Sequence, residues 1–220
     1  MTKTAIILGA SGATGSELLQ LLLADSRYST IKIFVRKSIN IANPKIEEHI
    51  IDLLQLEKYA PDFTAHEVYC CIGTTKAKTP HKDEYYKIDF GIPVTAAKLA
   101  KANGIDTYIV VSAVGASKSS NIFYRRTKGE MQEAVLSQNL PNMHILQPSL
   151  IVANRKDSRF AEKLAIVFMK VINPLLFGGA AKYKSINAAV IAKAMVWLAN
   201  NKYSDVIVTS DKINDMAKKV

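Results

Sequence analysis

The sequence predicts an α/β protein whose core is a doubly wound, mostly parallel sheet. Short apolar segments alternate along the chain with longer segments of helical periodicity, as they do in a series of βα units. Five of the apolar segments are followed by a glycine, a proline or a polar residue, at Arg36, Asp52, Gly73, Ser112 and Pro148. The carboxyl ends of parallel strands meet at one edge of a sheet, and open α/β sheets bind their ligands there. We therefore expect one ligand-binding edge.

The first βα unit is the most informative part of the chain. Residues 5–8 predict a short buried strand and residues 17–23 an apolar helix, with Gly9, Gly12 and Gly15 between them. Glycine allows a tight turn at the first position, close approach of a pyrophosphate at the second and close helix packing at the third. A plain glycine-rich turn is the alternative. The flanking strand and helix favour a dinucleotide site of the Rossmann type, formed by Gly9, Ala10, Ser11, Gly12, Ala13, Thr14 and Gly15.

The second predicted strand, residues 31–35, ends in a basic pair. NAD-binding folds place an acidic residue here for the ribose 2′-hydroxyl, whereas this chain has Arg36 and Lys37 and no neighbouring acid. An arginine suits a 2′-phosphate because its guanidinium forms charge-assisted pairs and stacks on adenine. We expect NADP(H), with NADPH preferred over NADH; an ordinary loop arginine is the alternative.

The next two strand ends supply further candidate cofactor residues. A third strand is predicted to end near residues 49–54, and a fourth covers residues 67–75. Glycine at a strand end lets backbone approach a cofactor, and threonine hydroxyls can donate to phosphate or ribose. The residues expected to line the cofactor here are Asp52, Leu53, Cys71, Ile72, Gly73, Thr74 and Thr75.

The second half of the chain continues the alternation. A helix is expected over residues 83–102, with a kink or restart at Pro93, followed by a strand over 108–112. Ser119, Ser120 and Asn121 are expected to cap a helix over 122–138 that carries Tyr124 and Lys128 on one face. The remaining elements are a strand over 142–147 before Pro148 and Ser149, helices over 159–171 and 187–199, and a strand over 205–209.

Composition narrows the class of protein. The 220 residues, 49% hydrophobic and 22% charged, predict one domain over 1–220, with residues 150–220 contributing a small substrate-side region. The net charge of +10 comes from scattered lysines without a nucleic-acid-reading motif, so we expect no nucleic-acid partner. The adjacent Cys70 and Cys71 point to opposite faces of a strand and lack metal-ligand spacing. We expect no signal peptide, and two cysteines of this kind are typical of a protein in the reducing cytoplasm. We also expect no bound metal.

The apolar stretch over residues 160–177 is interrupted by Lys163 and Lys170 and by Pro174. It is therefore too short and too charged to predict a membrane span, and core packing is the simplest interpretation. An apolar substrate lid, or a contact surface for a second copy, another protein or a membrane face, is the alternative.

Ser112, Tyr124 and Lys128 form a Ser…Tyr-x-x-x-Lys set. Together with the glycine triplet, Cys-Cys-Ile-Gly-Thr-Thr, Ser-Ser-Asn and Lys-Gly-Glu, they resemble the Tat-interacting-protein-like branch of the atypical short-chain dehydrogenases/reductases. The resemblance covers nearly the whole chain. It implies NADP(H)-dependent hydride transfer between the nicotinamide and a carbonyl/alcohol pair of a small molecule.

The resemblance also implies residue roles. Tyr124 would exchange a proton with the substrate oxygen, and Lys128 would stabilise its phenolate and hold the nicotinamide ribose. Ser112 would orient the carbonyl, Asp52 would contact adenine, and Pro148 and Ser149 would lie at the cofactor.

Two departures from the pattern define the alternative function. Asp89 stands where many of these enzymes have a proton-relay asparagine, and the region after Pro148 is short. The resemblance therefore also allows an NADP(H)-binding regulatory or assembly protein with little or no turnover.

Overall fold

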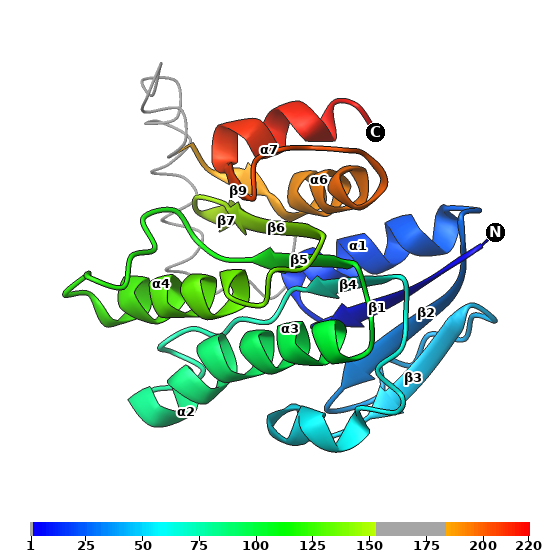
Figure 1. Ribbon diagram of the computed structural model, residues 1–220, viewed down its shortest axis with the longest axis horizontal. Coiled ribbons are helices and arrows are strands. Elements are labelled where there is room, and N and C mark those ends of the chain that lie inside the picture. Colours follow the sequence, from blue (N-terminus) through cyan, green and yellow to red (C-terminus); the bar gives the residue numbers. More distant parts are fainter. Residues whose placement is uncertain (1, 153–183) are drawn as a thin grey trace.

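The computed structural model describes residues 2–152 and 184–220. Within them a seven-stranded, wholly parallel sheet forms the centre of the fold, in the order β3-β2-β1-β4-β5-β6-β9 (Figure 1). This is the order of a doubly wound dinucleotide-binding fold, so the predicted fold class is confirmed. The strands are β1 Lys3–Leu8, β2 Tyr28–Val35, β3 Ile46–Ile50, β4 Glu67–Cys70, β5 Thr107–Val111, β6 Asn142–Gln147 and β9 Ile207–Thr209.

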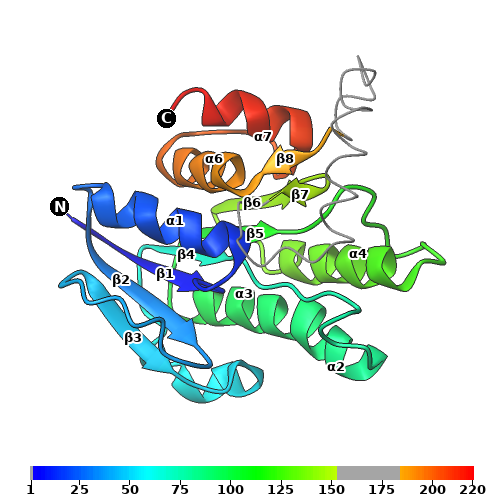
Figure 2. The same ribbon diagram turned by 180° about the vertical axis from the view of Figure 1, so that it is seen from behind.

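Helices cover both faces of this sheet (Figures 1 and 2). α1, α6 and α7 lie on one face, and α2, α3 and α4 on the other. Their bounds are α1 Ala13–Ala24, α2 Lys82–Tyr86, α3 Ile92–Ala102, α4 Phe123–Leu136, α6 Ala188–Asn200 and α7 Ser210–Ala217. A 3-10 helix, Leu53–Tyr59, follows β3, and a second, two-stranded parallel sheet pairs β7 Ile151–Val152 with β8 Ile186–Asn187.

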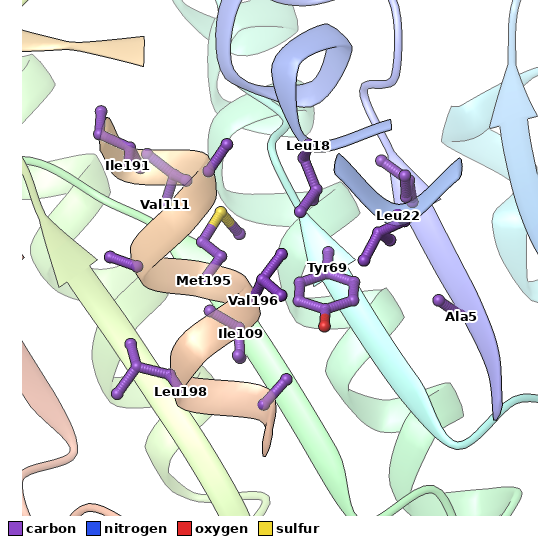
Figure 3. Close-up of a cluster of buried hydrophobic side chains, with 14 of the residues drawn as sticks. Ala5, Leu18, Leu22, Tyr69, Ile109, Val111, Ile191, Met195, Val196 and Leu198 are labelled. Atoms are coloured by element: carbon purple, nitrogen blue, oxygen red, sulfur yellow. The ribbon is translucent and has the colours of Figure 1, made fainter. Parts of the chain in front are cut away.

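The two helical layers explain why the strands are apolar without interruption. On β1, Ala5 and Ile7 belong to the core shared with α1 and α6, whereas Ile6 and Leu8 belong to the core on the opposite face. Figure 3 shows the first of these cores, in which side chains of α1 and α6 surround the ring of Tyr69. Residues 184–220 therefore supply both a strand and a helical layer of the main sheet.

Several local expectations need correction. The strand expected over 67–75 ends at Cys70, because the chain then turns toward Asp89, to which the Thr74 amide donates. α4 begins after Ile122 without a side-chain cap, and Ser120 instead accepts from the Ile122 amide. The sequence did not predict α7 or the β7–β8 pair. The helix expected over 159–171, and most of the apolar stretch 160–177, lie outside the described residues.

The helix expected over 83–102 restarts near Pro93, as predicted, through one π-helical turn at Lys87–Gly91 between α2 and α3. Pro93 has no amide proton and cannot donate to the carbonyl four residues before it, so a regular helix is interrupted there. The wider turn accommodates the interruption and turns the Asp89 side chain into the core, where it is buried. No helix of residues 2–152 and 184–220 is long and apolar enough to cross a membrane.

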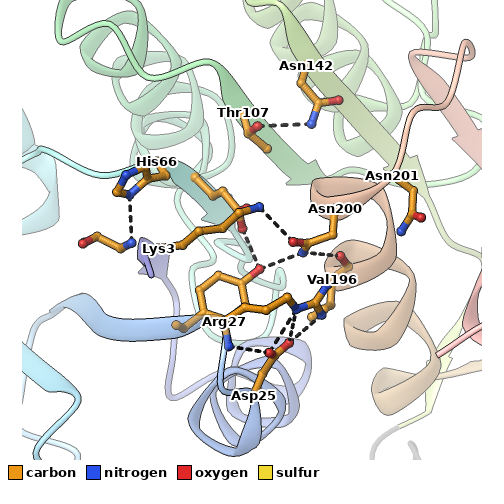
Figure 4. Close-up of polar contacts among 12 residues, drawn as sticks. Lys3, Asp25, Arg27, His66, Thr107, Asn142, Val196, Asn200 and Asn201 are labelled. Carbon is orange, nitrogen blue, oxygen red and sulfur yellow. Dashed lines mark hydrogen bonds and ion pairs between the residues drawn. The ribbon is translucent and has the colours of Figure 1, made fainter. Parts of the chain in front are cut away.

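A buried polar cluster joins the layers at the amino end of the sheet (Figure 4). Glu67 accepts from Lys3 at 2.5 Å, from Tyr69 at 2.6 Å and from Tyr28 at 2.8 Å. Asn200 of α6 donates to the Tyr28 hydroxyl and accepts from Lys3, both at 2.8 Å. Burial and the Glu67 charge raise the pKa of Tyr69, so its hydroxyl stays protonated and donates. This cluster links β1, β2 and β4 to α6 far from the ligand edge.

We predict that Glu67→Leu lowers the free energy of unfolding by about 2–4 kcal/mol, because two buried hydroxyls and Lys3 lose their acceptor. Glu133→Leu is the matched control, since it removes an exposed ion pair with Lys118 and should cost below about 1 kcal/mol. Urea unfolding measures both. Equal costs for the two variants would contradict a structural role for the cluster.

Candidate active site

The glycine turn after β1 is held by close backbone contacts. Gly9 has a φ of +85°, and a side chain there would lie 2.9 Å from the Cys71 carbonyl oxygen. A side chain on Gly15 would overlap the Gly9 carbonyl. The Gly12 amide donates to that carbonyl at 2.8 Å. Glycine is thus required by the protein's own packing at Gly9 and Gly15, as the sequence predicted for the turn and the helix contact.

Gly12 has a second constraint besides the expected ligand. A Cβ there would lie 3.0 Å from the Gly9 oxygen, so a larger residue would press on the turn itself. Gly12 is also the N-cap of α1, which has no side-chain cap and no acidic residue in its first turn. The positive end of α1 is therefore available to an anion at this edge. Ala10 and Thr14 of this turn are buried.

A cavity of about 650 Å³ lies beside this turn. Arg36 and Lys37 after β2 line it, as do Ser11 and the turn residue Ala10. Ser16, Gln20 and Ser38 also line it and were not predicted; Ser38 could have been found from its place beside the basic pair. Two cations and several hydroxyls next to a helix N-terminus fit a nucleotide whose ribose carries a phosphate.

Asp52 and Leu53 do not line this cavity. Asp52 is the N-cap of the 3-10 helix and accepts from the Leu54 amide and from the side chain of Gln55, at 3.0 and 3.1 Å. Leu53 is buried in the core on the α3 side of the sheet. The Asp52 carboxylate thus already has a local structural role, and its adenine contact stays a prediction.

The loop after β4 runs past a buried ion pair. Lys128 Nζ and Asp89 Oδ1 are 2.8 Å apart, and both side chains are buried. Asp89 Oδ2 accepts from the Thr74 amide at 2.8 Å. A Cβ on Gly73 would lie 3.7 Å from Asp89 Oδ1 and 3.9 Å from Lys128 Nζ, so this glycine lies directly beside the pair. Asp89, the departure from the family pattern, is the direct partner of Lys128.

The threonines of this loop make local contacts. The Thr74 hydroxyl is bonded to that of Thr79 at 2.9 Å, and the Thr75 carbonyl accepts from the amides of Lys78 and Thr79. The expected donation of the Thr74 hydroxyl to phosphate or ribose is compatible with this contact when Thr79 is its donor, because either hydroxyl can donate. Cys71 and Ile72 lead into the loop, and Cys71 lies against Met195 of α6.

Tyr124 lies one helical turn before Lys128, and its side chain is partly exposed at the ligand edge. Its pKa is raised above the usual value by burial, lowered by the charge of Lys128 and raised again by the charge of Asp89. The expected stabilisation of the phenolate by Lys128 is therefore outweighed, because burial favours the neutral form and Asp89 opposes the lysine. The hydroxyl is protonated at neutral pH.

Ser112 reaches the same face of α4 from the end of β5. Its side chain is buried, and its Oγ accepts from Gln132 Nε2 at 2.6 Å. Gln132 in turn accepts from Gln147 at 3.1 Å. Gln132 was not among the predicted residues, although its place four residues after Lys128 puts it on the same helical face.

Backbone packing fixes the loop after Ser112 against α4. A Cβ on Gly129 would overlap the backbone of Ser117 and Lys118, so only glycine allows this crossing. The structure thus brings Ser112, Tyr124 and Lys128 to one helix.

Pro148 and Ser149 follow β6 at the same edge. The Pro148 carbonyl accepts from the Val114 amide at 3.0 Å, and the Ser149 hydroxyl is bonded to the Lys184 carbonyl and to Ser210. These contacts tie the strand end to the C-terminal part of the chain.

Within the described ranges there is no group of three or more metal-ligating side chains. The ring nitrogens of the buried His144 contact the Asp205 carbonyl and Asn142, and burial lowers its pKa. Cys70 and Cys71 are both free.

The strand order, the glycine turn and the cavity beside it define a dinucleotide-binding protein of the Rossmann class. The family model for NAD(P)H-binding proteins matches residues 9–150, and the chain belongs to that family.

Its relatives place it in the atypical branch of the short-chain dehydrogenases/reductases. Protein HTATIP2 of Rattus norvegicus is 33% identical over 170 residues, covering 76% of this chain and 70% of that protein. Protein FMP52-1, mitochondrial, of Scheffersomyces stipitis is 29% identical over 202 residues, covering 84% and 88%. The resemblance seen in the sequence is thereby confirmed.

Solved structures of low sequence identity share the fold. MoeE5 in complex with UDP-glucose and NAD superposes with a TM-score of 0.69 at 13% identity, covering 98% of this chain and 81% of that one. The UDP-glucose 4-epimerase of Thermotoga maritima, with UDP-glucose, gives 0.69 at 13% identity, covering 98% and 82%.

We predict that Asp89→Asn lowers the pKa of Tyr124, because it removes a negative charge that raises this pKa and leaves Lys128 in place. Phenolate absorbance during a pH titration measures the change. Subtracting the titration of the same variant carrying Tyr124→Phe isolates this residue from the other tyrosines. An unchanged or higher Tyr124 pKa would contradict the assignment. Asp215→Asn, in an exposed pair with Lys218, is the control and should leave Tyr124 unaffected.

Proposed function

We propose that this chain is an NADP(H)-dependent oxidoreductase that interconverts a carbonyl and an alcohol in a small molecule. One observation carries the proposal: α4 presents Tyr124 beside the buried Lys128–Asp89 pair, with Ser112 held on the same helical face. A proton donor, a cation and an orienting hydroxyl are the groups that carbonyl reduction requires. They lie at the sheet edge that holds the glycine turn and its cavity.

The residues that line the cavity indicate how a cofactor would be bound. The backbone of the Gly9–Gly15 turn and the N-terminus of α1 would hold the pyrophosphate, and Arg36 and Lys37 would hold the 2′-phosphate. When bound, the nicotinamide supplies or accepts the hydride. Lys128, which lies beside Gly73, is suited to the nicotinamide ribose. The cavity supports NADPH over NADH because two cations line it and, among the described residues, no acid does.

The protein's own residues would handle the proton. The raised pKa of Tyr124 supports a role as the donor, because its hydroxyl is protonated at neutral pH. In the reducing direction the tyrosine would give its proton to the substrate oxygen, and in the reverse direction it would accept one. Ser112 would bind the same oxygen and fix its orientation.

A second function is favoured by the same ion pair. Asp89 offsets the charge of Lys128, and the Tyr124 phenolate is correspondingly disfavoured. An NADP(H)-binding regulatory or assembly protein needs the nucleotide site and no phenolate. Turnover with NADPH separates the two functions.

We further propose that residues 1–220 act as one nucleotide-binding domain with its substrate side formed by part of residues 150–220. The two free cysteines support a reducing compartment, which we propose to be the cytoplasm. Fractionation of cells with tagged protein tests the location, and a mitochondrial signal would overturn it.

Arg36→Asp should weaken NADPH binding roughly 10- to 100-fold, because the 2′-phosphate loses one charge-assisted partner and meets a negative charge. NADH affinity should change far less. Calorimetry measures both, with Lys98→Asp on the exposed face of α3 as a control of equal charge change. Equal affinity of the parent for NADPH and NADH would refute the preference.

Tyr124→Phe should reduce turnover of an accepted carbonyl compound by roughly 10²–10⁴, the contribution of a positioned acid, while NADPH affinity stays unchanged. A screen of carbonyl compounds with NADPH identifies the substrate first. Tyr59→Phe, at the end of the 3-10 helix, is the control. A full parental rate in Tyr124→Phe would show that another group donates the proton.

A further inference from the structure

Gln132 is a buried polar residue that the proposed reaction leaves without a role. It lies on α4, four residues after Lys128 and eight after Tyr124, so the three side chains share one face of the helix. The residue is 6% exposed, in a position where an apolar residue would be ordinary. Burying an amide costs free energy unless its groups are hydrogen-bonded, so its partners indicate why it is there.

The hydrogen bonds of Gln132 run in one direction, from Gln147 to Ser112. Its Nε2 donates to Ser112 Oγ at 2.6 Å, and its Oε1 accepts from Gln147 Nε2 at 3.1 Å. Gln147, at the end of β6, thus contacts the oxygen end of the Gln132 amide, and the nitrogen end faces the serine. The chain of donors runs from β6 through α4 to the end of β5.

This direction decides what Ser112 can do. A serine hydroxyl has one proton and two acceptor lone pairs, and Gln132 occupies a lone pair. The proton of Ser112 is not used in this bond and can be given to another acceptor. A carbonyl oxygen is such an acceptor, whereas a serine whose proton was held by the protein could not donate to it.

We propose that Gln132 is a positioning residue that makes Ser112 a hydrogen-bond donor to the substrate oxygen, with Gln147 fixing the orientation of the Gln132 amide. The proposal rests on the proposed function, since it concerns the same reaction. Gln132 acts only through Ser112 and touches neither substrate nor cofactor.

The test is a double-mutant cycle on turnover with NADPH. Gln132→Met keeps the length of the side chain and removes both hydrogen bonds. We expect kcat to fall about 10- to 100-fold, as when one oriented donor to a reacting oxygen is lost, with NADPH affinity unchanged. In the Ser112→Ala background the same substitution should cost less than about twofold, because there is no hydroxyl left to position.

Two further variants sharpen the result. Gln147→Met should cost less than Gln132→Met, because it removes only the bond that orients the amide. Gln138→Met is the matched control, since the Gln138 amide bonds to Ala134 and Ser137 at the end of α4, and it should keep the parental rate. Thermal melts confirm that each variant is folded.

The outcomes separate this proposal from the function on which it rests. A parent without turnover on any carbonyl compound overturns the proposed function and the positioning role together. Parental turnover that survives Gln132→Met overturns the positioning role alone. An equal loss in the parental and Ser112→Ala backgrounds also overturns it, because Gln132 would then act through general packing rather than through the serine.

Discussion

The close approach of three backbone segments at the end of β1 is the constraint on which the ligand edge depends. The Gly9 carbonyl lies directly against Gly15 of α1, and Gly9 itself lies against the Cys71 carbonyl beyond β4. A side chain at either glycine would push α1 or the loop after β4 away from the sheet. The first movement would displace the helix N-terminus, and the second would displace Gly73 from the Lys128–Asp89 pair. The two backbone contacts of Gly9 thus set the spacing between the glycine turn, α1 and the loop that runs past the Lys128–Asp89 pair.

Two buried clusters of charged residues lie at opposite ends of the sheet, and they have different roles. At the amino end, Glu67 and its partner Lys3 are hydrogen-bonded to two tyrosines and to Asn200, and these contacts join one layer to another. At the carboxyl end, the buried Lys128–Asp89 pair lies beside Gly73 and accepts a hydrogen bond from the Thr74 amide. The first arrangement is satisfied by side chains of the protein itself and stabilises the fold. The second lies at the edge of the sheet where folds of this class bind their ligands.

Hydrophobic periodicity and glycine spacing were enough to predict the parallel sheet and the strand ends before Arg36 and Ser112, because these features are local, whereas β4 ends at Cys70 rather than near Gly73. The partners of the site residues were not predictable in the same way. The pairing of Asp89 with Lys128 and of Gln132 with Ser112 depends on how the π-helical turn at Lys87–Gly91, α4 and β5 pack, which a single sequence does not state. The roles of these residues in binding and catalysis stay predictions.

The π-helical turn at Lys87–Gly91 has a consequence for how this protein can diverge. It behaves as one extra residue in an otherwise regular helix, and each residue added to a helix rotates the subsequent residues by about 100°. The faces of α2 and α3 are offset by that angle, and the burial of Asp89 depends on the offset. Amino-acid exchanges on the exposed face of this segment leave the geometry intact. Loss of a single residue would remove this offset and swing the carboxylate away from Lys128, so the geometry of the ion pair depends on the length of the segment.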